Sequence, residues 1–158
     1  MKISNIFNKL INNILIVDDN EDNVSLLEGY LSDIKGIRIY KSYNPLDAEE
    51  LLKTIDFSLL LLDIQMNDMD GYELATRIKY NNYGKNSNTP IVFITAIYDN
   101  DIDKMRGYNI GSIDYIIKPI TIDIVKKIRN YLDITNKKNS NKNFVIQRMD
   151  NINKSIKM

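Results

Sequence analysis

The amino-acid sequence predicts an α/β domain built on a doubly wound parallel sheet, and three observations favour this class. Five short apolar segments alternate along the chain with five segments of helical pattern, as in repeated strand–helix units. Residues 59–62 are four consecutive leucines, which is typical of a central parallel strand covered on both faces. With 158 residues, 44% of them hydrophobic, the chain is long enough for one domain with its own core.

The expected strands are short, and four of the five are followed by a polar residue that can carry chemistry. We place the strands at residues 14–17, 37–40, 57–62, 91–94 and 113–117. Asp18 and Asp19 follow the first strand, Asp63 follows the third, Thr95 the fourth and Lys118 the fifth.

The expected helices lie between these strands and after the last one. They occupy residues 20–33, 45–54, 71–79, 99–109 and 122–132. Asn20 can cap the first helix, and Pro45 stands near the start of the second, where its missing N–H is harmless. Asp70 and Gly71 mark a turn before the third helix, and the polar residues 81–89 predict a loop.

The polar residues at the strand ends should meet, because a doubly wound sheet binds ligands beyond the carboxyl ends of its strands. The carboxylates of Asp18, Asp19 and Asp63 would repel one another unless a cation lay among them, and Mg²⁺ prefers such oxygen ligands. An aspartate beside Mg²⁺ can accept a phosphoryl group, whose oxygens a lysine and a hydroxyl can hold. The absence of cysteine and histidine excludes thiol catalysis, His-ligated metals and a phosphohistidine on this chain itself.

Four sequence motifs carry a family resemblance. They are ILIVDDN at residues 14–20, LLLLDIQMNDMDGYE at 59–73, IVFITA at 91–96 and GSIDYIIKPI at 111–120. Their order and spacing over about residues 12–134 resemble the receiver domains of response regulators in two-component signal transduction, the single-domain chemotaxis regulators among them. The resemblance implies a flavodoxin-like fold: a five-stranded parallel sheet of strand order 2-1-3-4-5 with five helices.

The resemblance also implies a metal-dependent phosphorylation site. Asp63 would accept a phosphoryl group from the phosphohistidine of a sensor histidine kinase or a phosphotransfer protein. Asp19, Asp63 and the backbone carbonyl of Gln65 would ligate Mg²⁺ directly, whereas Asp18 would act mostly through water. The protein would then be a regulator and not an enzyme, catalysing only its own phosphorylation and dephosphorylation.

A second group of residues would respond to the phosphoryl group in this family. Lys118 would pair with it, Thr95 would move to hydrogen-bond it, and Tyr115 would turn inward as the aromatic switch. A downstream protein would read the change, and a phosphorylation-dependent homodimer is an alternative readout. The sequence departs from the family at Asn67, where proline usually follows the methionine, and we expect this to alter the stiffness of the loop more than the chemistry.

Other interpretations of the same residues stay open. Asp18 and Asp19 could merely cap the first helix, and Tyr115 could simply cover the core. Residues 106–120 resemble receivers found beside kinase or cyclase modules, so the chain could be the detached receiver module of a hybrid kinase or cyclase. A Mg²⁺-dependent phosphatase with an aspartate nucleophile is a further alternative, but it needs an acid two residues after the nucleophile, where this chain has Gln65.

We expect three parts: an extension at residues 1–11, a receiver domain at 12–134, where the resemblance lies, and a basic Asn- and Lys-rich tail at 135–158, which is either helical or disordered. From Asn136 the tail carries six basic residues and one acidic residue, within a chain whose total net charge is zero. No folded DNA-reading motif accompanies this charge, so we expect no nucleic-acid partner. No apolar run approaches the roughly 20 residues of a membrane span, and no signal peptide is evident, which predicts a cytoplasmic protein without membrane insertion.

Overall fold

The computed structural model describes residues 11–81, 83–96 and 109–156. Its chain forms two compact units, residues 1–125 and 126–158. The first unit contains the sheet and the polar residues that follow its strands, and the second consists of most of one long helix. The expected division into extension, receiver domain and tail stays a prediction.

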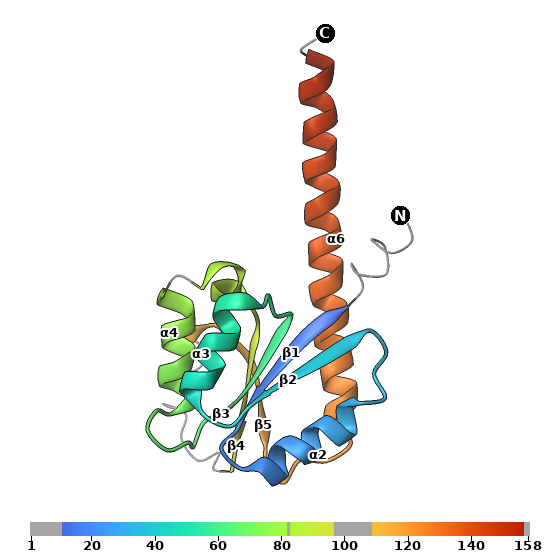
Figure 1. Ribbon diagram of the computed structural model, residues 1–158. Helices are drawn as coiled ribbons and strands as arrows, with labels where there is room; N and C mark the ends of the chain where they lie inside the picture. The colour runs from blue at the N-terminus through green and yellow to red at the C-terminus, as the bar shows by residue number, and fades with distance from the viewer. Residues whose placement is uncertain (1–10, 82, 97–108, 157–158) are drawn as a thin grey trace. The chain divides into compact units, whose positions relative to one another are not determined.

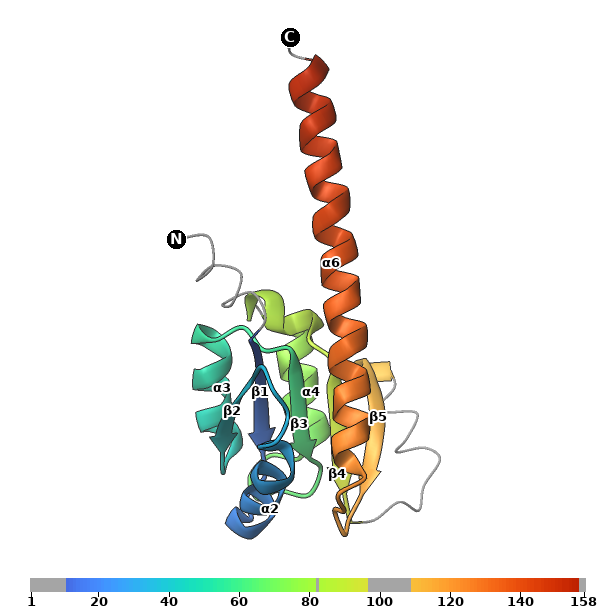
Figure 2. The same cartoon turned by 90° about the vertical axis from the view of Figure 1, so that its right-hand side faces the viewer.

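The first unit is built on a five-stranded, entirely parallel sheet in the order β2-β1-β3-β4-β5. The strands are β1 (Asn12–Val17), β2 (Ile37–Ser42), β3 (Leu59–Asp63), β4 (Ile91–Thr95) and β5 (Ser112–Ile117). Figure 2 shows them side by side in this order. The expected doubly wound, flavodoxin-like topology is confirmed, with strand ends that differ from the expected ones by one or two residues.

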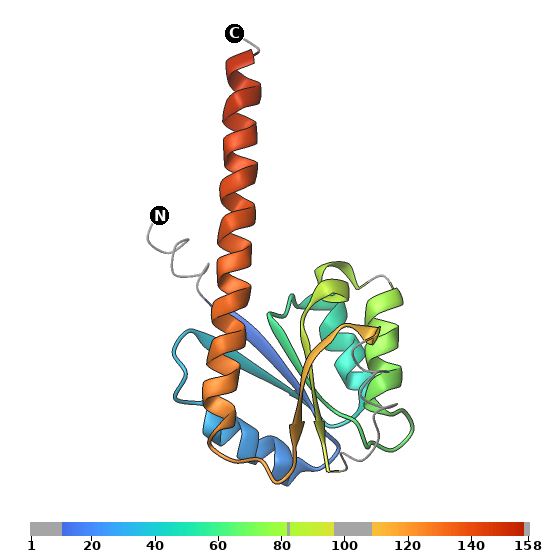
Figure 3. The same ribbon diagram turned by 180° about the vertical axis from the view of Figure 1, so that it is seen from behind.

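Helices cover both faces of this sheet, as the alternating pattern requires. They are α2 (Glu21–Leu31), α3 (Pro45–Thr54), α4 (Gly71–Tyr80) and the short 3-10 helix η1 (Gly84–Asn88). Helix α2 lies on one face, and α3 and α4 lie on the other (Figures 1 and 3). The helix expected at residues 99–109 lies, except for Asn109, outside the described residues.

Side-chain caps fix where these helices begin. The Asn20 side chain accepts backbone N–H bonds in the first turn of α2, and the Asn44 and Asp70 side chains do the same for α3 and α4. Each cap satisfies donors that a helix cannot pair internally. Asn20, and neither Asp18 nor Asp19, is therefore the cap of the first helix, which leaves both aspartates for another role.

Alternate residues of the central strands fill two apolar layers. Leu15, Leu60 and Phe93 point to the face covered by α3 and α4, where they form one cluster with helix residues such as Leu52 and Ala75. The intervening residues of β1, β3 and β4 are equally buried. Burial on both faces leaves polar side chains no place in the middle of these strands, so they lie at the ends.

The segment expected as a polar loop at residues 81–89 contains the 3-10 helix η1 and one buried side chain, Asn86. Its Oδ1 accepts the Phe57 amide at 2.9 Å, and its Nδ2 donates to the carbonyl oxygens of Leu52 and Ile55, each at 2.7 Å. These bonds satisfy backbone groups between α3 and β3. Asn86 thereby fixes the approach of the chain to the strand that ends in Asp63.

The last helix, α6 (Ile124–Ile156), is continuous over 33 residues, or about 50 Å at the usual rise. Its expected end near Leu132 was wrong, and the tail is helical through Ile156. No glycine or proline follows Pro119 in the sequence, so nothing stops the helix. Every residue from 136 to 156 is exposed. Within the described part of the chain, no helix is long and apolar enough to cross a membrane.

Candidate functional site

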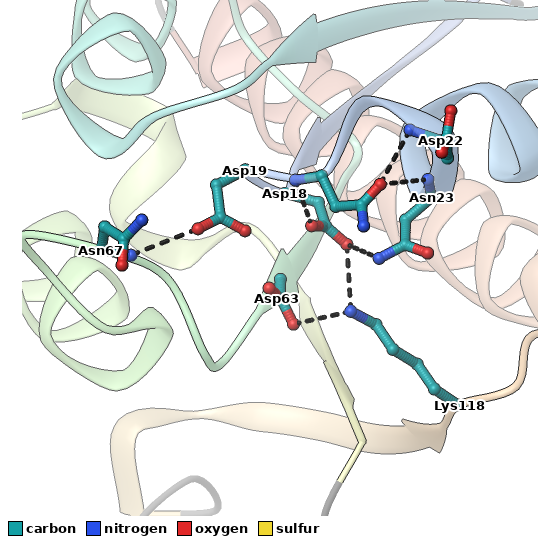
Figure 4. Close-up of polar contacts among 8 residues, drawn as sticks. Asp18, Asp19, Asp22, Asn23, Asp63, Asn67 and Lys118 are labelled. Atoms are coloured by element: carbon teal, nitrogen blue, oxygen red, sulfur yellow. Dashed lines mark hydrogen bonds and ion pairs between the residues drawn. The ribbon is translucent and has the colours of Figure 1, made fainter.

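The carboxyl edge of the sheet gathers the polar residues that the sequence singled out. Asp63 and Thr95 are the last residues of the neighbouring strands β3 and β4, Asp18 and Asp19 follow β1, and Lys118 follows β5. Asp18, Asp63 and Thr95 are almost completely buried, whereas Asp19 is exposed. Figure 4 shows the three aspartates and Lys118 pointing toward one another.

The lysine ammonium lies between the two buried carboxylates. Lys118 Nζ is 3.2 Å from Asp18 Oδ2 and 3.2 Å from Asp63 Oδ1. The Lys118 amide donates to the Thr95 carbonyl oxygen at 2.8 Å, which holds the lysine backbone beside the end of β4. Its side chain reaches past β4 to Asp63, at the end of β3. Burial disfavours the ammonium charge, but attraction to Asp18 and Asp63 outweighs it and raises the pKa of Lys118. This ion pair joins the first, third and fifth strands.

The three aspartates form a cluster with more negative charge than one lysine can balance. One carboxylate oxygen from each of Asp18, Asp19 and Asp63 lies within 4.8 Å of the others. When all four side chains are ionised, the aspartates and Lys118 together carry a charge of −2. Hard oxygen ligands that converge with such a surplus are the ligand set of Mg²⁺ in proteins. The cluster therefore fits a divalent cation in donor type, spacing and charge.

Hydrogen bonds from the start of α2 hold Asp18 in place. Its Oδ1 accepts the Asn20 amide at 2.9 Å, and its Oδ2 accepts the Asn23 side-chain amide at 3.2 Å. The backbone also fixes the residue, because the Asp18 amide donates to the Ser42 carbonyl oxygen at 3.1 Å. With the Lys118 ammonium, these donors satisfy a carboxylate that is buried to 1% exposure.

Asp63 is less well compensated than Asp18. Burial, and then the negative charge of Asp18, raise the pKa of Asp63 from 3.8 to about 6, although Lys118 opposes the shift. The carboxylate is therefore partly protonated near neutral pH when no cation is bound. A carboxylate whose negative charge is disfavoured gains from any added positive charge beside it.

Gly71 lets α4 approach the end of β3. A Cβ atom at this position would lie 2.3 Å from the Asp63 carbonyl oxygen and 2.9 Å from the Ile64 Cα. The Gly71 amide also donates to the Ile64 carbonyl oxygen at 2.8 Å. The N-terminus of α4 thus packs directly on the backbone that carries Asp63, and only glycine fits there.

The loop between β3 and α4 makes a second contact with the cluster. The Asn67 backbone amide donates to Asp19 Oδ2 at 3.3 Å, a bond that proline at this position could not make. The next residue, Asp68, has a positive φ of 69°, and the Met69 amide donates to the Asn67 carbonyl oxygen at 2.8 Å. This geometry is a γ-turn, an uncommon and strained conformation. Because asparagine has an amide hydrogen that proline lacks, the departure at Asn67 gives Asp19 an additional hydrogen bond.

Tyr115 lies on β5 with its ring buried at 6% exposure. Its hydroxyl is 3.2 Å from the Tyr72 hydroxyl, and its ring packs on Phe93 with centroids 5.5 Å apart. The tyrosine is thus inside the protein. The site's other expected contributor, Gln65, lies exposed in the loop after β3, where its backbone is close in sequence to Asp63.

Comparison with known proteins identifies the family. Residues 14–129 match the model of the response regulator receiver domain. The chain belongs to this family. Its four strand-end motifs and the topology of its sheet agree with the membership. Receiver domains of this family are parts of the response regulators of two-component systems.

Individual relatives of this chain are longer proteins with different outputs. It is 34% identical over 125 residues to a probable cyclic di-GMP phosphodiesterase of Vibrio cholerae, covering 79% of this chain and 27% of that protein. It is 30% identical over 154 residues to the probable transcriptional regulator ycf27 of Cyanidium caldarium, covering 97% and 57% of the two chains. The chain therefore spans less than two thirds of either relative.

A solved structure supports the same assignment. The crystal structure of a two-component response regulator from Clostridium difficile aligns with a TM-score of 0.68 at 33% identity. The alignment covers 77% of this chain and 96% of that chain.

The sequence pattern did not reveal the role of several residues at the receiver site. Gly71 was interpreted as part of a turn, because its contact with the Asp63 backbone depends on how α4 packs. Asn23 stands five residues after Asp18, a spacing with no motif attached to it. Tyr72 received no role from the sequence, because its contact with Tyr115 joins residues 43 positions apart. Only the departure at Asn67 gave a local signal.

Gly71→Ala should displace the end of β3 and lower the stability of the receiver domain by about 1–3 kcal/mol, because the added methyl group overlaps the Asp63 backbone. Urea unfolding followed by circular dichroism measures the change. Gly29→Ala is the matched control, since nothing lies within 4 Å of a Cβ built on Gly29 in helix α2, and alanine should there be neutral or stabilising. Equal stabilities of the two variants would contradict the packing assigned to Gly71.

The raised pKa of Asp63 predicts a pH-dependent stability in EDTA. The native state binds this proton more tightly than the unfolded chain, so the contribution of Asp63 is full below pH 3.8 and is lost as the pH rises through about 6. Asp63→Asn should therefore stabilise the protein at pH 7.5, by up to about 3 kcal/mol for a pKa raised from 3.8 to about 6. The gain should shrink between pH 6 and pH 4.

Urea unfolding of both proteins at a series of pH values measures this gain. Asp33→Asn, at an exposed position just after α2, is the control for loss of one negative charge. A gain for Asp63→Asn that does not vary with pH, or a loss of stability at pH 7.5, would show that Asp63 is not a disfavoured carboxylate.

Proposed function

We propose that the protein is a phosphorylation-dependent response regulator in which Asp63 accepts a phosphoryl group from the phosphohistidine of a sensor histidine kinase or a phosphotransfer protein. One observation supports this most strongly: the Lys118 ammonium lies 3.2 Å from both Asp18 and Asp63, inside a cluster of three aspartates. An acceptor carboxylate beside a lysine ammonium, in a cluster whose charge suits a divalent cation, fits phosphoryl transfer, which depends mainly on positioning and charge stabilisation.

The aspartate cluster would hold Mg²⁺. Asp19 and Asp63 would ligate it directly, the backbone carbonyl of Gln65 would complete the protein's set, and Asp18 would act mostly through water. Mg²⁺ would supply positive charge to the oxygens of the incoming phosphoryl group. The charge of −2 on the three aspartates and Lys118 together matches that of a divalent ion, and the ligand atoms of the aspartates lie within 4.8 Å of one another.

The transfer step would use Asp63 as the nucleophile. A carboxylate oxygen of Asp63 forms the new bond to phosphorus while the bond from phosphorus to the histidine nitrogen of the donor breaks, and that nitrogen retains the electron pair. Attack by water on the acyl phosphate later releases inorganic phosphate and restores the carboxylate. These 158 residues contain no histidine, so the phosphohistidine of the donor lies outside them, or a small phosphodonor supplies the group.

Lys118 and Thr95 would then hold the phosphoryl oxygens. Lys118 already contacts Asp63 Oδ1 and is 20% exposed at its side chain, so it can shift from the carboxylate to a phosphoryl oxygen. Thr95 ends the neighbouring strand and would supply a hydroxyl. Tyr115 would report the change to a downstream protein, with a phosphorylation-dependent homodimer as the alternative reader.

Intact-mass measurement tests the proposal. The protein is incubated with acetyl phosphate, with Mg²⁺ or with EDTA, beside the variants Asp63→Asn and Asp68→Asn. Wild type and Asp68→Asn should gain one phosphoryl group only when Mg²⁺ is present, and Asp63→Asn should gain none. Asp68 is a close control, because it is an exposed aspartate five residues further along the same loop.

Two outcomes would overturn the proposal. A phosphoryl group that persists in Asp63→Asn would identify another acceptor. No adduct on the folded wild-type protein, in the presence of Mg²⁺ and with a purified histidine kinase as a second donor, would mean that this receiver domain works without phosphorylation.

A further inference from the structure

Two buried tyrosines, one of them at the switch position, meet in the core of the protein. Tyr72, on α4, is 4% exposed and Tyr115, on β5, is 6% exposed, and their hydroxyl groups are 3.2 Å apart. Both rings pack on Phe93 of β4, with centroids 4.8 Å from Tyr72 and 5.5 Å from Tyr115. The three rings form one aromatic group beneath the carboxyl edge of the sheet.

The hydrogen bond adds direction to this packing. Phenylalanine at position 72 would fill nearly the same volume, whereas the tyrosine hydroxyl gives the Tyr115 hydroxyl a fixed partner inside the core. Buried polar groups favour the one arrangement that satisfies them. The Tyr72 hydroxyl therefore favours the conformer of Tyr115 in which the ring is inside the protein.

The backbone links Tyr72 to the phosphorylation site. Tyr72 directly follows Gly71, whose amide donates to the Ile64 carbonyl oxygen and whose Cα packs on the Asp63 backbone. Phe93 lies two residues before Thr95 on the same strand. Tyr115 is thus in contact with two elements of the site, the helix that packs on Asp63 and the strand that ends in Thr95.

We propose that Tyr72 is a positioning residue that holds Tyr115 buried before any phosphoryl group arrives. The inference rests on the proposed role of Tyr115 as the switch. The unphosphorylated protein then already favours the inward conformer, and phosphorylation of Asp63 strengthens an existing preference through Thr95. Removal of the Tyr72 hydroxyl should shift the balance toward an outward Tyr115 by roughly fivefold, the effect of losing one ordinary hydrogen bond.

Site-resolved hydroxyl-radical footprinting with mass spectrometry measures the exposure of Tyr115 in the full chain. The proteins compared are wild type, Tyr72→Phe and Tyr80→Phe, the last being a control at a position of the same helix α4 that is 73% exposed. Oxidation of Tyr115 should rise about fivefold in Tyr72→Phe and stay at the wild-type level in Tyr80→Phe. Equal protection of Tyr115 in all three proteins would overturn the inference.

A second arm separates positioning from simple packing. Phosphorylation of Tyr72→Phe with acetyl phosphate and Mg²⁺ should restore the protection of Tyr115, because Thr95 then supplies the bias that the hydroxyl supplied before. Persistent exposure of Tyr115 in the phosphorylated variant would assign Tyr72 a packing role only. If the wild-type protein takes up no phosphoryl group, the proposed function fails, while the footprinting of the unphosphorylated proteins still decides whether Tyr72 holds Tyr115.

Discussion

The Lys118 ammonium offsets the repulsion between the carboxylates of Asp18 and Asp63. It lies 3.2 Å from the buried carboxylates of both Asp18 and Asp63, at the carboxyl edge of a sheet whose central strands have buried apolar residues in their middle. Two buried carboxylates without this partner would carry a large desolvation cost. The compensation is incomplete, since a third carboxylate, Asp19, lies within 4.8 Å. Burial, and then the negative charge of Asp18, still raise the pKa of Asp63 in spite of Lys118.

Hydrogen bonds and packing fix the two buried aspartates, whereas the lysine side chain is held less tightly. Asp18 is fixed by the bonds it accepts from Asn20 and Asn23, and Asp63 ends a buried strand against which Gly71 packs. Lys118, in contrast, keeps a partly exposed side chain that can exchange one partner for another. A fixed acceptor beside a movable cation is the combination that a reversible covalent signal requires.

The local pattern of the sequence predicted the parallel sheet and the polar residues at its edge, and the resemblance to receiver domains implied the order of the strands. The apolar runs Ile14–Val17 and Leu59–Leu62 predict buried strands. The polar residue after each run must then lie at the carboxyl edge of the sheet. Contacts made by packing had no such signal. The clash that requires Gly71, and the hydroxyl pair of Tyr72 and Tyr115, exist only once α4 meets β3 and β5. Helix α6 exceeded its expected length because a run of Asn and Lys marks a helix end less reliably than Gly or Pro.

The central claim is that Asp63 and Lys118 are the acceptor and the responding cation of one phosphorylation site. A crystal structure grown with Mg²⁺ and beryllium trifluoride, a mimic of the acyl phosphate, tests it most directly. We expect beryllium to be bonded to an Asp63 oxygen and Mg²⁺ to be ligated by Asp19 and Asp63. Lys118 Nζ should have left the Asp63 carboxylate and should contact a fluorine atom. An unmodified Asp63, with Lys118 still 3.2 Å from both Asp18 and Asp63, would contradict it.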